Sequence, residues 1–281
     1  MENTTPSQSN APHPPTRFLT VDGGSIAYDV RGSGPLLLLV PGMGDLRSGY
    51  RLLAPRLVAA GYTVVTTDLR GHGDSDATFP SYGDEETARD IEALIRELGE
   101  SAVIVGNSMA AGAAVIVAAN HPELVTGLVL VGPFVRDQSG NGFAMLLFRV
   151  MTAQPWAAAV WKAYIPTLYS GERPADFSEY REKVIASIKR PGYARAFSKT
   201  TRLNHAVAGE SLAKVAAPTL VVMGDKDPDF TNPQAEAEWI ARELRGTAVM
   251  VANAGHYPQS QQPELTSAAV IPFLASLSSN A

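Results

Sequence analysis

A serine at a predicted strand-to-helix junction is the residue with the clearest chemical potential in this sequence. The apolar run Val103–Val105 is followed by Gly106, Asn107 and Ser108, and then by a run of small residues. A sharp turn of this kind pushes a serine side chain out at the carboxyl end of a strand, where its hydroxyl can attack a substrate. Serine is also common at the start of ordinary helices, so this turn alone leaves both interpretations open.

The residues on either side of Ser108 are small, as a tight turn requires. Glycine is usual two positions before and two positions after such a nucleophile. This chain has Gly106 in the first place and Ala110 in the second. Alanine is the next smallest residue, so the turn is expected to be slightly more strained but is not excluded.

His256 is the histidine best placed to act as a base for Ser108. It follows the apolar run Ala248–Val251 in the last third of the chain. Open α/β sheets place their sites just beyond the carboxyl ends of strands, and the base follows the serine in this arrangement. We expect His256 to take the proton of Ser108 and return it to the leaving group. Structural roles fit His72 and His121 better. His205 lies in the helical insertion and could reach a substrate, although a structural role fits it better as well, and His13 lies in the N-terminal tail.

Three aspartates crowd the turn after the apolar run Thr219–Met223. They are Asp225, Asp227 and Asp229. One carboxylate must hold the imidazole in the right tautomer and stabilise the imidazolium. Alternation along an extended turn puts all three roughly on one side, so their spacing does not choose among them. Pro228 biases Asp227 toward an extended conformation, which favours presentation of its carboxylate from the loop.

Attack on a carbonyl carbon places negative charge on the substrate oxygen, and backbone N–H groups must stabilise that charge. Met109, directly after Ser108, supplies one N–H group at the start of a helix. We expect the second from the loop Pro41–Gly44, which follows the apolar run Leu36–Val40, and we assign it to Met43. Both methionines would act through the backbone, so their side chains are free to line an apolar pocket.

The sequence contains no motif for a cofactor or a metal. There is no cysteine, which excludes a disulfide framework, a thiolate zinc site and a cysteine nucleophile. A Gly-x-Gly-x-x-Gly loop and histidines paired at metal-ligand spacing are also missing. We therefore expect side chains alone to act on a small-molecule substrate, with no cofactor.

Composition limits the classes of molecule that this protein is expected to bind. The 281 residues are 45% hydrophobic and carry a net charge of -5 without a basic block, which argues against nucleic acid. No run approaches the roughly 18 apolar residues of a membrane span. Residues 1–16, MENTTPSQSNAPHPPT, lack the basic start and apolar core of a secretory signal. We expect a soluble, cytoplasmic protein in which residues 1–16 form a disordered tail.

Apolar runs and helical patterns alternate over most of the chain. The expected strands are Arg17–Val21, Ile26–Val30, Leu36–Val40, Thr63–Thr67, Ala102–Val105, Leu128–Val131, Thr219–Met223 and Ala248–Val251. Helices are expected between and after them, among others at Tyr50–Ala60, Glu86–Leu98, Pro233–Leu244 and Pro263–Leu277. This succession indicates an α/β fold with a mostly parallel sheet wrapped by helices.

The alternation stops near Phe134 and resumes at Pro218. We interpret residues 134–212 as an inserted helical cap on a core made of residues 17–133 and 213–281, because strands of the same kind lie on both sides. Most aromatic residues of a cap pack against the core. Pockets are mostly apolar, so some should wall the site, and we expect Met151 and Trp161 among them.

Five short segments, each weak alone, together resemble the α/β-hydrolase superfamily. They are Pro41–Gly44, Asp68–Ser75, Gly106–Ala110, Gly224–Asp227 and Gly255–His256. The likeness runs from about Arg17 to the end, apart from the cap, and implies the α/β-hydrolase fold with a serine, histidine and aspartate triad. In that family the acid usually stands three residues after the glycine of its turn, which implies Asp227. The chain departs from the family at Pro41, where histidine is more frequent, and at Ala110, where glycine is.

The resemblance also separates branches of the superfamily. Haloalkane dehalogenases and epoxide hydrolases use aspartate at the position of Ser108, so the serine argues against both branches. Carbon–carbon bond hydrolases of ring-cleavage products often show Gly-Asn-Ser-Met-Gly here, and Tyr257 stands where they typically have tryptophan, which suggests that Tyr257 contacts the substrate.

The leading hypothesis is hydrolysis of a carboxylic ester or lactone of a smallish apolar substrate through an acyl-enzyme. A second hypothesis is a carbon–carbon bond hydrolase of a ring-cleavage diketone. A third is a non-hydrolytic enzyme on the same triad, such as a perhydrolase, a lyase or an acyltransferase. A fourth is a non-catalytic binding protein, because a fold alone does not establish a function.

Overall fold

An eight-stranded sheet forms the centre of the computed structural model, which describes residues 14–137 and 149–278. The strand order is β1-β2-β4-β3-β5-β6-β7-β8, antiparallel at β1, β2 and β4 and parallel across all later pairs. The predicted α/β fold with a mostly parallel sheet is therefore confirmed. The strands are β1 (Arg17–Val21), β2 (Gly24–Arg31), β3 (Leu36–Val40), β4 (Thr63–Thr67), β5 (Ala102–Asn107), β6 (Val125–Val131), β7 (Thr219–Gly224) and β8 (Thr247–Val251).

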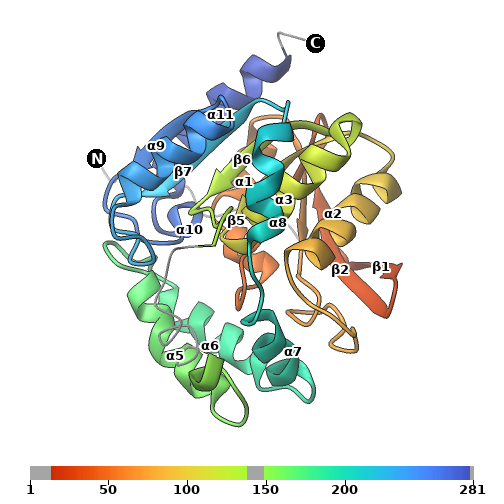
Figure 1. Cartoon of the computed structure of the whole chain (residues 1–281), viewed down its shortest axis with the longest axis vertical. Coiled ribbons are helices and arrows are strands. Elements are labelled where there is room, and N and C mark those ends of the chain that lie inside the picture. Colours follow the sequence, from red (N-terminus) through yellow and green to blue (C-terminus); the bar gives the residue numbers. More distant parts are fainter. Residues whose placement is uncertain (1–13, 138–148, 279–281) are drawn as a thin grey trace, which may run out of the picture.

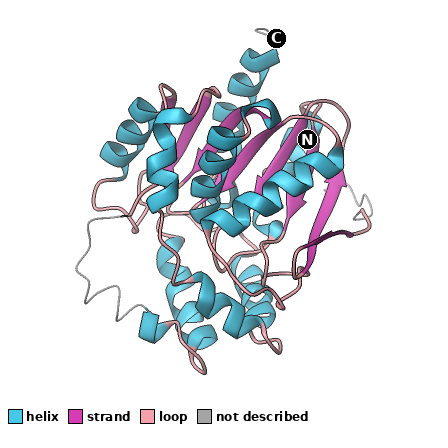
Figure 2. Cartoon of the chain, turned by 45° about the vertical axis from the view of Figure 1, so that its right-hand side comes forward, coloured by secondary structure: helices cyan, strands magenta, loops and turns pink. Residues whose placement is uncertain are grey.

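Helices cover both faces of the sheet (Figure 2). They are η1 (Arg47–Tyr50), α1 (Ala54–Ala59), α2 (Asp84–Leu98), α3 (Met109–Asn120), η2 (Pro122–Leu124), α5 (Ala157–Leu168), α6 (Phe177–Ile188), α7 (Tyr193–Thr200), α8 (Ala206–Ser211), η3 (Leu212–Lys214), α9 (Pro233–Glu243), α10 (Pro258–Gln261) and α11 (Pro263–Ser278). Residues of α2, α3 and α9 pack on one face, and residues of α1 and α11 on the other. No helix among these residues combines the length and the apolar character that crossing a membrane requires.

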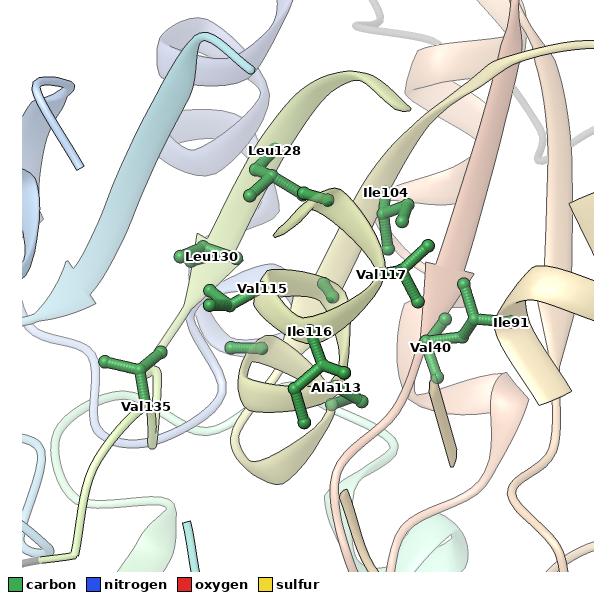
Figure 3. Packing of buried hydrophobic residues seen from close by; sticks show 14 of the residues in the cluster. Val40, Ile91, Ile104, Ala113, Val115, Ile116, Val117, Leu128, Leu130 and Val135 are labelled. Carbon is green, nitrogen blue, oxygen red and sulfur yellow. The ribbon is translucent and has the colours of Figure 1, made fainter. Parts of the chain in front are cut away.

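Helix α3 is buried on every side, and this burial fixes the turn from which it starts. Its small residues let it lie close to the sheet, and Val115 and Val117 pack among Ile104, Leu128 and Leu130 of the neighbouring strands (Figure 3). Tightly packed interiors tolerate little displacement. The first residue after β5 is therefore held at a defined place on the sheet edge.

Helices α5, α6 and α7 gather beyond the carboxyl edge of the sheet (Figure 1). They share an apolar cluster of their own, which includes Trp161, Phe177 and Phe197. Helix α8 differs, because it packs on α2 and α3 in the core layer, where Gly112 and the buried Ala208 allow a close approach. The proposed cap, residues 134–212, therefore contains a segment that packs with the core, and part of it, residues 138–148, lies outside the described residues.

One predicted helix is wrong in extent. Residues Tyr50–Ala60 were expected to form a single helix, but η1 ends at Tyr50 and α1 spans only Ala54–Ala59. Pro55 lies in the first turn of α1. Proline lacks a backbone N–H and clashes with the preceding turn, so it fits the start of a helix and not its interior.

Candidate active site

Ser108 lies at the sharp turn between β5 and α3. Its φ of 58° and ψ of -126° are unusual for a residue with a side chain, and such strained conformations gather at functional sites. The turn depends on glycines, because a Cβ on Gly106 would lie 2.6 Å from the carbonyl oxygen of Ala110, and one on Gly42 would lie 2.6 Å from Cβ of Ser108. Ala110, which stands where glycine is usual after such a serine, is completely buried beside this turn.

His256 and Asp227 are joined by a buried hydrogen bond. Nδ1 of His256 lies 2.8 Å from Oδ2 of Asp227, and both side chains are almost completely shielded from solvent. Asp229 is more distant, with its Oδ2 3.6 Å from the same nitrogen. Asp225 faces away, since its Oδ1 accepts from the backbone N–H of Ala254 at 3.3 Å. The structure thus brings Asp227, rather than Asp225, to His256, and it adds Asp229 as a neighbour.

The charges around His256 favour its protonated form. Burial would lower its pKa, but the negative charge of Asp227, the hydrogen bond with Asp227 and the charge of Asp229 outweigh burial and raise the pKa of His256 to about 9. Burial also raises the pKa of Asp229, against the opposing effects of His256 and of a hydrogen bond from Tyr164. The hydroxyl of Tyr164 donates to Oδ1 of Asp229 at 2.6 Å. Tyr164 thus engages one oxygen of Asp229, while the other oxygen stays 3.6 Å from the imidazole.

Ser108 and His256 line the same cavity, of about 450 Å³. No hydrogen bond joins their side chains, and such contacts often tighten only when a substrate binds. The apolar part of the wall includes Met43, Met109, Phe134, Trp161, Tyr164, Leu168, Leu203 and Tyr257, and the polar part Asp137, Arg149, Thr201, Asn204, His205 and Asp229.

Two of the three residues expected to contact the substrate lie in this wall, and one does not. Trp161 and Tyr257 line the cavity. Met151 does not; its side chain is 39% exposed on the outer surface. It sits on a short helical turn next to Arg149, and that turn presents Arg149 to the cavity instead. Met151 is therefore a correction to the expected pocket.

The loop expected to supply an oxyanion donor is held from two sides. Gly44 donates its N–H to Nε2 of His72 at 3.0 Å, and its carbonyl accepts from Nε1 of Trp161 at 2.8 Å. Burial lowers the pKa of His72 to about 4, so the neutral ring serves as the acceptor. The N–H of Gly44 is thereby occupied, whereas that of Met43 has no partner among the described residues. This arrangement is compatible with Met43 as a donor.

The comparison with known families decides the broad identity. Residues 37–269 match the alpha/beta hydrolase family. The chain belongs to this family.

Individual relatives extend the comparison over almost the whole α/β-hydrolase. It is 28% identical over 264 residues to a 2-(acetamidomethylene)succinate hydrolase of Mesorhizobium japonicum, covering 90% of this chain and 94% of the relative. It is 25% identical over 255 residues to a pyrrolizixenacetamide deacetylase of Xenorhabdus hominickii, covering 87% of this chain and 92% of the relative. A bromoperoxidase of Bacillus anthracis shares the fold with a TM-score of 0.81 at 18% identity, covering 93% of this chain and 100% of that one.

Two residues of the hydrolase that position the candidate site were missed in the sequence. Nδ2 of Asn107 donates to the carbonyl oxygens of Val131 and His256 at 3.0 and 3.2 Å, so it ties β6 and the histidine loop to the serine turn. Gly132 has a φ of 50°, and a Cβ there would lie 3.2 Å from both Oδ2 of Asp227 and Nδ1 of His256. A glycine directly after a strand was the available signal for Gly132.

One group of three acids and histidines among the described residues has ligand atoms close enough to one another, within 4.8 Å, to hold a metal ion. It consists of Asp227, Asp229 and His256. Their facing atoms are already engaged with one another or with Tyr164. A cation would have to displace these hydrogen bonds. The expectation that the α/β-hydrolase needs no metal stays a prediction.

Proposed function

We propose that this α/β-hydrolase is a serine hydrolase that cleaves a carboxylic ester or lactone of a small substrate with an apolar body. Ser108 is the nucleophile, His256 the base and Asp227 the acid that orients the base. The observation that carries the proposal is the buried 2.8 Å hydrogen bond that joins Asp227 to His256, a residue that lines the same cavity as the strained Ser108.

The proposed reaction proceeds in two halves. His256 takes the proton of Ser108 through Nε2 as Oγ attacks the acyl carbon, while Asp227 holds Nδ1. The backbone N–H groups of Met109 and Met43 stabilise the oxygen that becomes negative. The tetrahedral intermediate expels the alcohol, which receives the proton from His256. A water molecule then attacks the acyl-enzyme, gives its proton to His256 and releases the acid as Ser108 regains its own.

A variant that lacks the nucleophile tests this proposal. We expect Ser108→Ala to lower kcat on a panel of 4-nitrophenyl esters by roughly 10³–10⁶, since the three residues act as a unit. A fluorophosphonate probe should label the unchanged protein at Ser108 and should not label the variant. The melting temperature should hardly change, because the substitution deletes one hydroxyl. A folded variant with near-normal turnover would overturn the mechanism, and an unlabelled parent protein would favour a non-catalytic binding protein.

Amide hydrolysis is a second candidate, favoured by the two relatives. One is named a hydrolase of an acetamidomethylene compound and the other a deacetylase. An acyl-enzyme on Ser108 would form in the same way, with an amine instead of an alcohol accepting the proton of His256. Matched pairs of acetate esters and N-acetyl amides separate the two candidates. A vinylogous ring-cleavage diketone in the same panel tests for cleavage of a carbon–carbon bond.

A further inference from the structure

A second imidazole–carboxylate pair places its imidazole in the wall of the same cavity. His205 precedes α8, and its Nδ1 lies 2.7 Å from Oδ2 of Asp84, the first residue of α2. The side chain of Asp84 is only 3% exposed. Gly112 provides the space for it, because a Cβ there would lie 2.8 Å from Oδ2 of Asp84. Burying a carboxylate is costly unless it is paired, so the packing around Asp84 favours this arrangement with His205.

Phe134 fixes His205 relative to the proposed base. Its ring stacks on the imidazole of His205 with 5.6 Å between centroids, and it meets the imidazole of His256 edge-on at 5.9 Å. The backbone N–H of His205 also donates to Oδ1 of Asp137 at 2.7 Å. His205 is therefore held one aromatic ring away from His256, within reach of a substrate bound at Ser108.

The wall around His205 presents hydrogen-bond donors that have no partner among the described residues. Nδ1 of His205 is engaged with Asp84, which leaves Nε2 for the cavity, and Nε2 is a donor when the ring carries both protons. The side-chain oxygen of Asn204 accepts from the N–H of Ala206 at 3.2 Å, which leaves its amide nitrogen as a donor. The guanidinium of Arg149 lines the cavity and forms no ion pair with any residue of 14–137 or 149–278.

The two carboxylates of the same cavity are already engaged. Asp229 accepts from the hydroxyl of Tyr164, and Asp137 accepts from the backbone of His205. Arg149, Asn204 and His205 are the groups of this wall that can donate to a ligand, and the guanidinium of Arg149 is cationic. A carboxylate is the small group that accepts several such hydrogen bonds at once, and bonds between ionised partners are the strongest of their kind.

We propose that His205, Asn204 and Arg149 form a subsite for a carboxylate carried by the acyl part of the substrate. In the form of the imidazole that carries both protons, His205 donates from Nδ1 to Asp84 and from Nε2 to the substrate. The favoured substrate is then a half-ester of a short dicarboxylic acid. This substrate class rests on the proposed serine hydrolase activity, but binding of the carboxylate does not require turnover.

Binding to the full-length Ser108→Ala variant tests the subsite without catalysis. The probes are monomethyl adipate and methyl hexanoate, which share a six-carbon acyl chain and differ in a terminal carboxylate or methyl group. By titration calorimetry we expect monomethyl adipate to bind about tenfold more tightly, as a charge-assisted hydrogen bond suggests. Adding His205→Gln should remove most of this preference.

His121→Gln is the matched control in the same background. His121 also faces carboxylates, with Nε2 3.2 Å from Glu92 and Nδ1 3.6 Å from Glu123, but it lies outside the cavity. The substitution should leave the preference for monomethyl adipate intact. If His205→Gln does not fold, Arg149→Gln carries the same test from an exposed position, and it should reduce the preference about threefold as one of several donors.

Equal affinity for the two probes would overturn the subsite, and so would a preference that survives both His205→Gln and Arg149→Gln. The active enzyme provides a second measurement with mono-4-nitrophenyl adipate and 4-nitrophenyl hexanoate. His205→Gln should lower the ratio of their kcat/KM values about tenfold, mainly through KM for the adipate ester. If the binding preference is present but neither ester is hydrolysed, the subsite stands and the proposed hydrolase activity falls.

Discussion

The two histidine–carboxylate pairs at the cavity have nearly the same distance between Nδ1 and the carboxylate oxygen, 2.8 Å in His256–Asp227 and 2.7 Å in His205–Asp84. They differ in the elements that carry them. His256 and Asp227 follow the adjacent strands β8 and β7, whereas His205 lies in a connection before α8 and Asp84 starts α2. An imidazole beside a carboxylate therefore does not define a catalytic group by itself. Its place relative to the serine turn gives each pair a different proposed role.

The surroundings of the two imidazoles differ as well. The ring of His256 is 3% exposed and has Asp229 as a second acid near Nδ1. The ring of His205 is 12% exposed and shares its part of the wall with Asn204 and Arg149. A shielded base beside two acids suits proton transfer with the neighbouring Ser108. A partly exposed ring among donors suits recognition of a substrate group.

Removing the carboxylate from each pair should separate these roles most strongly. We expect Asp227→Asn to lower kcat by about 10⁴ for every ester, because the amide favours the wrong tautomer of His256. Asp84→Asn should cost less than about tenfold in kcat and should act mainly on KM for esters that carry a carboxylate. Steady-state kinetics with the hexanoate and adipate esters measures kcat and KM for both variants. Similar losses of kcat in both variants would show that the two pairs share one function.

The pH dependence of kcat/KM should identify the pair that transfers protons. His256 must be neutral to accept a proton, and the charge of Asp227 raises its pKa to about 9 against the effect of burial. Activity should therefore increase as the pH rises through about 9, above the range of an isolated imidazole.

In Asp227→Asn the midpoint of this profile should move to lower pH, because the negative charge that stabilised the imidazolium is lost. Asp84→Asn provides the control, and its profile on the hexanoate ester should keep the midpoint of the parent protein. A midpoint that stays in place in Asp227→Asn would contradict the assignment of His256 and Asp227.

Trp161 and Met151 allow a smaller contrast within the cap. Trp161 lines the cavity and bonds Gly44, whereas Met151 lies on the outer surface. Trp161→Ala should change the preference among ester chain lengths by about tenfold, since a buried aromatic contact is worth one to a few kcal/mol. Met151→Ala should leave the preference unchanged.

Trp161→Phe keeps an aromatic ring but removes the hydrogen bond to Gly44. Together with the melting temperature, it separates loss of packing from loss of the loop contact. Equal losses on all esters in Trp161→Ala, accompanied by a lower melting temperature, would support a purely structural role for this residue.

The sheet could be predicted well because its central strands are buried on both faces. Such strands are continuous apolar runs, as in Leu36–Val40, whose predicted bounds agree with β3. The predicted bounds of the more polar Thr63–Thr67 also agree with β4. The presence of His256 and Ser108 in one cavity followed from the same property, since the ends of parallel strands meet at one edge. The choice among three aspartates needed the family resemblance, because residues of one extended turn share a side.

The far wall of the cavity could not be predicted from local patterns. Asp84 and His205 are 121 positions apart, and their contact depends on how α8 packs against α2 and α3. Arg149 and Met151 are two positions apart on one helical turn, and only the packing of that turn decides which one reaches the cavity. Because this wall was not foreseen, the sequence predicted an apolar substrate. The structure adds hydrogen-bond donors to one part of a cavity that is otherwise largely apolar.

The smallest expected effects distinguish the acids of the turn around Asp227. Asp225 accepts a backbone hydrogen bond from Ala254, and Asp229 is bonded by Tyr164 with its nearest oxygen 3.6 Å from Nδ1 of His256. Neither carboxylate makes the short bond that fixes the imidazole. We expect Asp225→Asn and Asp229→Asn each to change kcat by less than about tenfold, because asparagine can replace aspartate in turn hydrogen bonds.

Asp229→Asn should still have one effect that Asp225→Asn lacks. The charge of Asp229 contributes to the raised pKa of His256, so its removal should shift the pH profile slightly to lower pH. Asp225→Asn should leave the profile in place and at most lower the melting temperature through its turn. A large loss of kcat at Asp225 or Asp229, with little at Asp227, would move the role of the acid to another residue while leaving Ser108 and His256 in theirs.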